Sequence, residues 1–197
     1  MSFKLGLTGS IGMGKSTTAN LFADAGCAVW DADAAVHRLY AKDGAAVPSM
    51  QALFPEAISG GAVDRSALRM IIGTRSDALK LIEGVVHPLV RQDRADFLAA
   101  AKSDVVVFDI PLLFETGAET EMDAVVCVTV SPEEQEKRVL DRGTMTVEQF
   151  RTIRDKQMPN DEKCARSDYV IKTDTLEHAR AQVHDVLKQI KAEMSDA

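Results

Sequence analysis

The sequence has few cysteines, no long apolar run and no excess of positive charge. Its three cysteines are widely spaced and form no C-x-x-C pair, so we expect reduced, buried thiols in a cytosolic protein; they are Cys27, Cys127 and Cys164. No apolar stretch approaches the ~20 residues of a membrane-spanning helix. The N-terminus lacks a basic segment followed by a long apolar run, so no signal peptide is expected.

Acidic residues outnumber basic ones. The formal net charge is −7 at pH 7, which argues against broad electrostatic binding to nucleic acid or to an anionic membrane. The composition is that of a globular protein, with 46% hydrophobic and 27% charged residues, enough for a packed core. A chain of 197 residues without internal repeats suits one large domain, or a core domain with an inserted lobe.

A glycine-rich stretch near the start of the chain is the strongest functional signal. Gly9 to Ser16 fits the pattern G-x-x-x-x-G-K-[ST] and follows an apolar run that ends at Thr8. Glycine lets the backbone come close to phosphate oxygens, and a helix predicted over residues 15–25 extends the anion site. Lys15 adds a charge for the β- and γ-phosphates, and the Ser16 hydroxyl can ligate Mg²⁺. The alternative is a glycine-rich turn without a ligand.

Two carboxylates follow the next predicted strand, Cys27 to Trp30. They are Asp31 and Asp33. In open α/β sheets ligands bind at the carboxyl ends of the strands, so we expect at least one of these acids to be functional. The alternative is that one of them only caps the following helix, since Asp is a favoured N-cap residue.

Residues 34–101 carry no strand signal and are predicted to be helical. Amphipathic helices are expected over 65–72 and 76–86, and Pro88 suits the first position of a last helix that runs to about residue 101. A crossover needs only one helix, so most of this stretch is predicted to be an inserted lobe for a second substrate. His87 is expected to contact substrate or to pack, rather than to act as a catalyst.

The apolar run from Val105 to Asp109 predicts a buried parallel strand that ends in an acid. An acid at this position near a phosphate loop resembles the Walker-B acid, which helps to hold Mg²⁺. The segment Leu112–Leu113–Phe114 is too apolar for an ordinary exposed loop. It either packs inward or forms a wall for an apolar part of a substrate.

Strands are also predicted over 124–130 and 168–171, with a last amphipathic helix beginning near Thr175. Capping signals at Ser131 and Thr146 open two helices that carry several basic side chains around Gly143. This pattern is typical of the mobile lid of a small kinase, which supplies arginine to the transferred phosphoryl group. The alternative is a solvated, charged helical hairpin.

The chain resembles the dephospho-coenzyme A kinase family along nearly its full length. The matching stretches are Gly6–Gly9, Gly14–Ser16, Asp31–Asp33, Gly61–Arg65, His87–Val90, Asp109–Glu115 and the helix with Gln135, Arg138 and Arg142. The phosphate loop alone indicates only a nucleotide binder, whereas the D-x-D, H-P and D-x-P-L-L-F-E segments in this order are far more specific.

The resemblance implies an α/β P-loop fold with a core of five parallel strands over residues 1–33 and 102–197, a helical substrate lobe over 34–101 and a lid over about 138–160. It implies transfer of the ATP γ-phosphoryl group to the ribose 3′-hydroxyl of dephospho-coenzyme A, with Mg²⁺, in the cytoplasm. The implied partners are ATP and dephospho-coenzyme A, without nucleic acid or membrane, and the implied state is a monomer or weak homo-oligomer.

The resemblance also implies site residues at the matching positions. The expected catalytic residues are Asp33 as the base, Lys15 and Arg142. The expected ATP-binding residues are Gly9, Ile11, Gly12, Met13, Gly14, Lys15, Ser16, Thr17, Arg138 and Arg142. The expected acceptor-binding residues are Asp31, Asp33, His87, Asp109, Leu112, Leu113 and Phe114. Ser16 is the expected Mg²⁺ ligand, and Asp109 is a further candidate.

The chain departs from the family pattern at two positions. Gly143 follows the lid arginine, where the family usually has an acid or Asn, and Thr173 replaces an Asn after the last strand. Two rival functions are another small P-loop kinase, acting on a nucleoside or nucleoside monophosphate, and a GTP-dependent switch. The switch needs an N-K-x-D guanine motif, and the closest string here, from Ile171 to Asp174, lacks the Asn.

Overall fold

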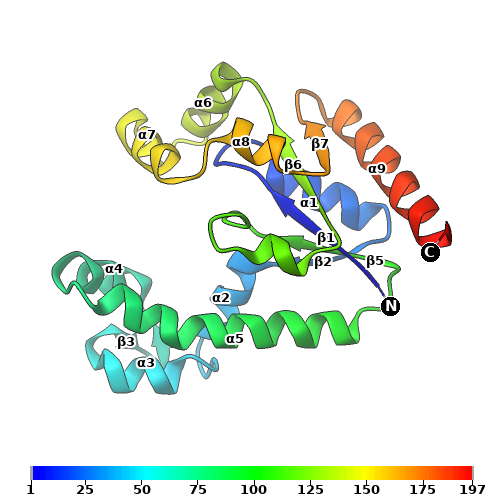
Figure 1. Ribbon diagram of the computed structural model, residues 1–197. Helices are drawn as coiled ribbons and strands as arrows, with labels where there is room; N and C mark the ends of the chain where they lie inside the picture. Colours follow the sequence, from blue (N-terminus) through cyan, green and yellow to red (C-terminus); the bar gives the residue numbers. More distant parts are fainter. Residues whose placement is uncertain (1, 197) are drawn as a thin grey trace. The chain divides into compact units, whose positions relative to one another are not determined.

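The computed structural model describes residues 2–196, which form two compact units (Figure 1). One unit contains the chain up to Trp30 together with the chain from Ala101 onward, and the other is Asp31–Ala100. The division places Asp31 and Asp33 with the second unit, whereas the sequence analysis assigned both acids to the nucleotide-binding core.

The first unit is built on a five-stranded sheet with the order β2-β5-β1-β6-β7. The strands are β1 (Phe3–Thr8), β2 (Ala28–Asp31), β5 (Val105–Asp109), β6 (Ala124–Thr129) and β7 (Tyr169–Lys172). Strand β1 pairs in parallel with β5 and β6, and β6 pairs in parallel with β7. The predicted α/β class and its five strands are therefore confirmed.

Alternation along β1 divides its side chains between two faces of the sheet. Leu5 and Leu7 belong to the cluster that helices α1 (Lys15–Asp24) and α9 (Leu176–Asp196) complete. Gly6, on the other face, lies under Leu113, whose Cδ2 would be 3.0 Å from a Cβ at position 6. The register places Leu7 opposite Asp109, so the carboxyl ends of β1 and β5 lie together.

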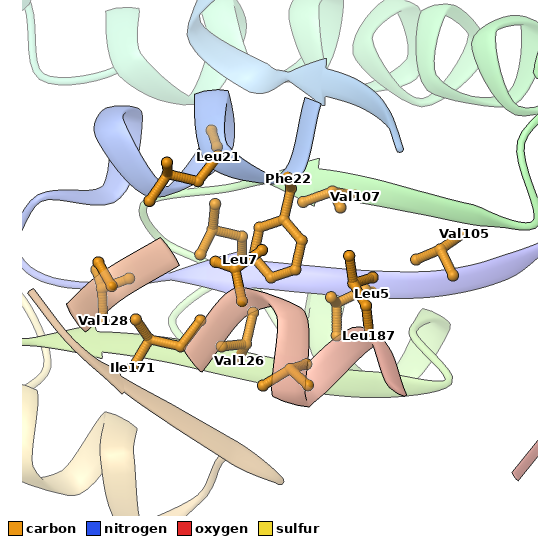
Figure 2. Close-up of a cluster of buried hydrophobic side chains, with 14 of the residues drawn as sticks. Leu5, Leu7, Leu21, Phe22, Val105, Val107, Val126, Val128, Ile171 and Leu187 are labelled. Carbon is orange, nitrogen blue, oxygen red and sulfur yellow. The ribbon is translucent and has the colours of Figure 1, made fainter. Parts of the chain in front are cut away.

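The core between the sheet and the two helices is almost free of polar atoms (Figure 2). Phe22 from α1 and Leu5 from β1 are fully buried, and Leu187 from α9 is 5% exposed. Burying each such side chain stabilises the fold by about 1.5–3 kcal/mol relative to exposure. This core sets the position of the segment between β1 and α1, which is the glycine-rich stretch.

The second unit is mainly helical, with its own core. Its elements are α2 (Ala32–Tyr40), α3 (Val47–Leu53), η1 (Pro55–Ala57), β3 (Ile58–Ser59), β4 (Ala62–Val63), α4 (Arg65–Thr74) and α5 (Ala78–Ala100). Strands β3 and β4 pair in an antiparallel hairpin around Gly60 and Gly61, which both have positive φ. The expectation that this stretch holds no strand was therefore wrong, because two-residue strands leave no periodic signal.

The helix α5 runs without a break through Pro88, where the sequence analysis expected one helix to end and another to begin. Proline removes one intrahelical hydrogen bond and disfavours a helix interior. Packing outweighs this local cost, because α5 lies against both α2 and α3. An ion pair of 2.6 Å between Arg38 and Asp93 further joins α2 to α5.

The rest of the first unit consists of short helices: η2 (Ala118–Glu121), α6 (Pro132–Asp141), α7 (Val147–Lys156) and α8 (Asn160–Ala165). Ser131 and Thr146 cap α6 and α7, and the complete capping box at Thr146 is present as predicted. Helix α8, which packs against β6, was not predicted. Within residues 2–196 no helix has the length and apolar character needed to span a membrane.

Candidate functional site

The glycine-rich loop depends on glycine at two positions with positive φ. Gly12 has φ 81° and Gly14 has φ 91°, and Gly14 is also the N-cap of α1. A Cβ at position 12 would lie 2.6 Å from Val139 Cγ2, and one at position 14 would lie 2.9 Å from Thr173 Oγ1. Any other residue would thus meet both backbone strain and a steric clash.

The loop presents a set of backbone donors. The N–H groups of Gly12 and of residues 14–17 have no acceptor within residues 2–196. Those at the start of α1 are the donors that every helix N-terminus leaves without an intrahelical partner. Converging N–H groups at a helix N-terminus make an anion site, and the helix dipole favours negative charge there.

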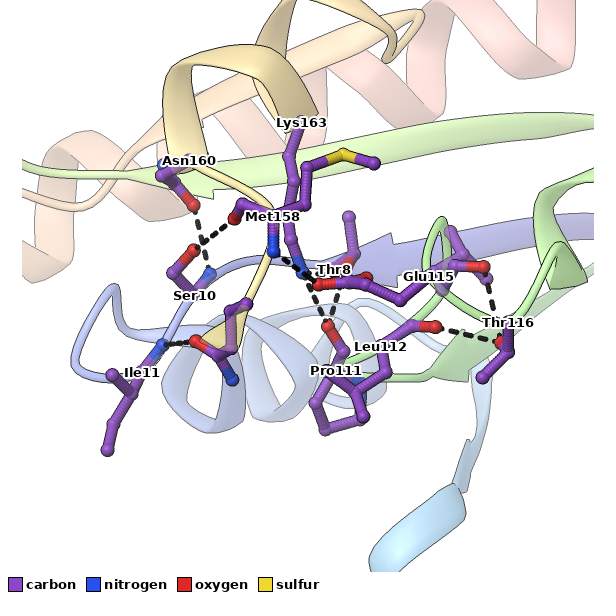
Figure 3. Close-up of polar contacts among 12 residues, drawn as sticks. Thr8, Ser10, Ile11, Pro111, Leu112, Glu115, Thr116, Met158, Asn160 and Lys163 are labelled. Atoms are coloured by element: carbon purple, nitrogen blue, oxygen red, sulfur yellow. Dashed lines mark hydrogen bonds and ion pairs between the residues drawn. The ribbon is translucent and has the colours of Figure 1, made fainter. Parts of the chain in front are cut away.

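The first two N–H groups after Gly9 have acceptors within the protein. Ser10 N–H donates to Asn160 Oδ1 at 2.9 Å, and Ile11 N–H donates to Gln157 Oε1 at 3.0 Å (Figure 3). The Ile11 amide, which the sequence analysis placed in the ATP site, therefore already has a partner. The unpaired donors begin at Gly12.

Lys15 and Asp109 form an ion pair between the loop and the end of β5. Lys15 Nζ lies 2.5 Å from Asp109 Oδ1, and their side chains are 15% and 1% exposed. A carboxylate as buried as Asp109 needs such a partner, because an uncompensated buried charge is strongly destabilising. The pair places the lysine ammonium at the carboxyl edge of the sheet.

The site also has oxygen atoms suited to a hard cation. Ser16 and Thr17 are exposed at the start of α1, and Mg²⁺ favours hydroxyl, carboxylate and phosphate oxygens. Within residues 2–196, no three or more His, Cys, Asp and Glu side chains lie close enough together to hold a metal. A magnesium ion here would therefore depend on the oxygens of a bound phosphate and on water, together with Ser16.

Side chains from α6 and from the end of β7 support the loop from outside. Gln135 Nε2 donates to the Ile11 carbonyl at 2.7 Å, and Thr173 Oγ1 donates to the Met13 carbonyl at 2.7 Å. Arg138 in turn donates to the hydroxyl and the carbonyl of Thr173, at 3.1 and 2.7 Å. The departure at Thr173 thus has a structural role, because its hydroxyl links the loop to α6.

A pocket of about 210 Å³ opens beside the loop. It is lined by Gly14, Thr17, Thr18, Arg138, Arg142, Thr173, Asp174, Thr175, Leu176 and Ala179. Arg138 is held by Glu134 at 2.9 Å as well as by Thr173. Arg142 follows α6 directly, is exposed and has no partner in the described chain. The pocket therefore contains one fixed and one unpaired guanidinium.

Asp31 and Asp33, the two acids at the start of the second unit, have different surroundings. Asp31 is the N-cap of α2 and accepts a hydrogen bond from Ala34 N–H at 2.8 Å. Asp33 lies in the first turn of α2, exposed and without a hydrogen-bond partner among residues 2–196. His87 is exposed in the middle of α5. These three residues belong to the second unit, whereas the phosphate loop belongs to the first.

The apolar segment after β5 is divided between core and surface. Leu113 is fully buried, and Phe114 is 7% exposed beneath the Arg166 guanidinium, which lies 4.5 Å from its ring centroid. Leu112 is 42% exposed. Of the three residues of this segment that were expected to contact the acceptor, only Leu112 presents its side chain to solvent.

Lys163 and Glu115 were not predicted as site residues, although Glu115 is linked to the loop through Met158. Lys163 in α8 is fully buried and forms an ion pair of 2.9 Å with Glu115. Glu115 lies within a stretch that matches the family pattern, but nothing in the local sequence marks a buried lysine at position 163. A helix of six residues with four charged or amide side chains gives no sign of an inward face.

Comparisons with known proteins agree with this architecture. A sequence model of the family described as dephospho-CoA kinase matches residues 3–178. A dephospho-CoA kinase from Ruegeria pomeroyi is 65% identical over 192 residues, which cover 98% of this chain and 98% of that protein. The solved structure of a Thermus thermophilus protein named TT1252 is 34% identical, with a TM-score of 0.85 over 98% of this chain and 97% of its own. A dephospho-CoA kinase from Campylobacter jejuni, 24% identical, shares the fold with a TM-score of 0.71 over 96% of this chain and 98% of its own.

Proposed function

The chain belongs to the dephospho-CoA kinase family, and we propose that it transfers the γ-phosphoryl group of ATP to the ribose 3′-hydroxyl of dephospho-coenzyme A. The products are coenzyme A and ADP. The observation that carries the proposal is the row of unpaired N–H groups at Gly12 and residues 14–17, next to the Lys15 ammonium. It occurs in a chain that shares 65% identity with a dephospho-CoA kinase over nearly its whole length.

ATP occupies the phosphate loop and the pocket beside it. The β- and γ-phosphates accept hydrogen bonds from the N–H groups of Gly12 and residues 14–17, and Lys15 neutralises their charge. The rest of the nucleotide lies in the pocket that contains Arg138, Arg142 and residues 173–176. Within residues 2–196 no group binds the Arg142 guanidinium, so Arg142 is free to move onto the transferred phosphoryl group. Arg138 keeps Thr173 and the loop in place.

Dephospho-coenzyme A is bound by the second unit, with Asp33 as the general base. In the reaction the 3′-oxygen forms a bond to the γ-phosphorus, the bond from that phosphorus to the bridging oxygen of ADP breaks, and the hydroxyl proton passes to Asp33. Asp31 caps α2, and the Asp33 carboxylate has no partner within residues 2–196, which supports this assignment. His87 and Leu112 are proposed contacts of the acceptor.

Mg²⁺ is the proposed cofactor, held by Ser16 with Asp109 nearby, and it would neutralise charge on the phosphates when bound. The chain's own contribution is positional, because phosphoryl transfer requires aligned oxygens and fixed positive charge more than covalent chemistry.

We further propose that the protein is a cytoplasmic monomer or weak homo-oligomer. Three free cysteines suit a reducing compartment.

The test is a coupled assay that follows ADP release from ATP with dephospho-coenzyme A as acceptor. Nucleosides, nucleoside monophosphates and water serve as competing acceptors, and GTP replaces ATP in a parallel titration. We expect turnover with dephospho-coenzyme A to exceed that with every other acceptor, and the product to carry a new 3′-phosphate. Preferred phosphorylation of a nucleoside, or tighter binding of GTP, would overturn the proposal in favour of one of its rivals.

A further inference from the structure

The side chain of Lys163 is fully buried on the inner side of α8. Its Nζ donates to the Pro111 carbonyl at 2.8 Å and lies 2.9 Å from Oε1 of Glu115 (Figure 3). Lysine is almost never fully buried unless it is paired. The amine is therefore held by two groups of the segment that follows β5, and it fixes that segment against α8.

Glu115 makes a second contact that leads toward the phosphate loop. Its Oε1 accepts a hydrogen bond from Met158 N–H at 2.9 Å. Burial raises the pKa of Glu115, but the hydrogen bonds from Lys163 and from Met158 N–H outweigh burial and leave the pKa below its usual value. The ionised carboxylate thus holds the backbone of the segment between α7 and α8.

That segment is the one that supports the start of the phosphate loop. Gln157 accepts from Ile11 N–H and Asn160 accepts from Ser10 N–H, on either side of Met158. The Met158 carbonyl also accepts a long hydrogen bond of 3.5 Å from the Ser10 hydroxyl. A continuous set of contacts therefore runs from Lys163 and Glu115 through residues 157–160 to Ser10 and Ile11 (Figure 3).

Lys163 of the same ion pair also binds the segment that follows β5. Pro111, whose carbonyl accepts from Lys163, also accepts from the Thr8 hydroxyl at 3.2 Å, at the end of β1. Leu112, the exposed apolar residue that we propose contacts the acceptor, follows Pro111 directly. Two segments far apart in sequence, 110–115 and 157–160, thus meet at one lysine and one glutamate.

We propose that Glu115 and Lys163 are positioning residues, whose ion pair keeps the phosphate loop and the segment carrying Leu112 in one fixed arrangement. The inference rests on the proposed kinase function but names no group that touches ATP or the acceptor. Loss of the pair releases residues 157–160, and with them the acceptors that hold Ser10 N–H and Ile11 N–H. ATP binding and turnover then fall because the donors from Gly12 onward are no longer aligned.

A purely structural role makes a different prediction. If the pair only stabilised the fold, its loss would lower the melting temperature and leave the KM for ATP and kcat of the folded fraction unchanged. The chain offers a matched control in Glu119, whose Oε1 lies 2.9 Å from Arg166 Nη2. Arg166 of that pair touches the Met158 sulfur at 3.8 Å, but among the described residues neither Glu119 nor Arg166 bonds to the Met158 N–H or to the groups of residues 157–160 that hold Ser10 and Ile11.

The experiment compares three variants with the wild type and with Glu119→Gln. Glu115→Gln keeps an acceptor for Met158 N–H but removes the charge, Lys163→Met removes the amine, and the double variant removes both charges. The double variant avoids leaving one buried charge without its partner, which single substitutions at such pairs risk. Melting temperature, steady-state kinetics and calorimetric binding of a non-hydrolysable ATP analogue are measured well below the lowest melting temperature.

For the double variant we expect kcat/KM for ATP to fall by at least about tenfold, within the roughly 10²-fold loss that misplaced groups cause. Analogue affinity should fall as well, while Glu119→Gln stays within about twofold of the wild type. A folded double variant with wild-type ATP affinity and kcat would overturn the proposal, as would an equal kinetic loss in Glu119→Gln. If the wild type proved to use another acceptor, the proposed function would fail, but analogue binding by the variants would still decide the role of the pair.

Discussion

Lys15 Nζ lies 2.5 Å from Asp109 Oδ1 at the carboxyl edge of the sheet, and the Asp109 side chain is only 1% exposed. The lysine thus compensates a buried carboxylate. The same ammonium is proposed to bind the phosphates of ATP. The phosphate loop and the end of β5 are in this way linked electrostatically as well as by the parallel register of β1 and β5.

The first prediction follows from this pair. Lys15→Met should abolish most of the turnover and also lower stability, because removing one partner of a buried pair costs about 3–5 kcal/mol. Adding Asp109→Asn should restore part of the melting temperature without restoring activity. Calorimetric melting and the ADP-release assay measure the two effects. A Lys15→Met protein as stable as the wild type would mean that the pair does not compensate Asp109.

The second prediction separates the two acids of α2. Asp33→Asn should reduce turnover by roughly 10²–10⁴, the contribution of a positioned general base, and should leave the melting temperature unchanged. Asp31→Ala should destabilise the protein by about 1 kcal/mol because it removes the helix cap, whereas Asp31→Asn should cap nearly as well as the wild type. Turnover and melting are compared across the three variants. An active Asp33→Asn enzyme would exclude Asp33 as the base.

The third prediction concerns the two arginines of the pocket. Arg142→Ala should lower kcat while leaving the melting temperature and the affinity for dephospho-coenzyme A without ATP unchanged, because the guanidinium has no partner in the described chain. Arg138→Ala should weaken ATP binding and reduce stability together, since it removes the hydrogen bonds to Thr173. Steady-state kinetics and titrations with dephospho-coenzyme A distinguish the roles of the two arginines. If Arg142→Ala lost only acceptor binding, its role at the transferred phosphoryl group would be wrong.

The fourth prediction concerns the reactivity of Cys164, whose Sγ lies 3.4 Å from that of Cys127. The hydrogen bond between the two thiols lowers the pKa of Cys164 to about 7, while the same contact and burial raise the pKa of Cys127. The thiolate is the reactive form and predominates above the pKa. The rate of alkylation of Cys164 by iodoacetamide should therefore rise with pH around a midpoint near 7.

Cys127→Ala is the control for this assignment. Without the neighbouring thiol, the midpoint for Cys164 should move up toward about 8.5, the ordinary value for cysteine. Mass spectrometry of the modified peptides identifies which thiol has reacted at each pH. An unchanged midpoint in Cys127→Ala, or faster modification of Cys127 than of Cys164 in the wild type, contradicts the prediction.

Local sequence was enough to predict the sheet and its phosphate loop. The strands β1 and β5 are short apolar runs closed by a turn signal or an acid, and such runs form buried parallel strands wherever helices cover both faces. The positions of Gly12, Gly14 and Lys15 follow from the chemistry of phosphate binding, which requires those residue types at that spacing. The family also follows from linear motifs in a fixed order.

Other features depended on contacts between residues far apart in the chain. Local rules place Pro88 at a helix start, yet packing of α5 against α2 and α3 carries the helix through it. The apolar segment 112–114 could have faced core or solvent, and the space above Gly6 decides that Leu113 is buried while Leu112 is exposed. Propensity is a weak local preference, and burial of a large apolar side chain outweighs it.

The sequence by itself therefore determined the fold class, the phosphate-binding chemistry and the family, because each is encoded by neighbouring residues. Only the tertiary structure decided that Asp31 caps α2 while Asp33 meets no partner in the described part of the chain, and that Lys163 is buried against Glu115. The lysine has no local mark, since its burial depends on a carboxylate 48 residues earlier in the chain. A buried charge is tolerated only where folding supplies its partner, and that partner cannot be identified until the chain has folded.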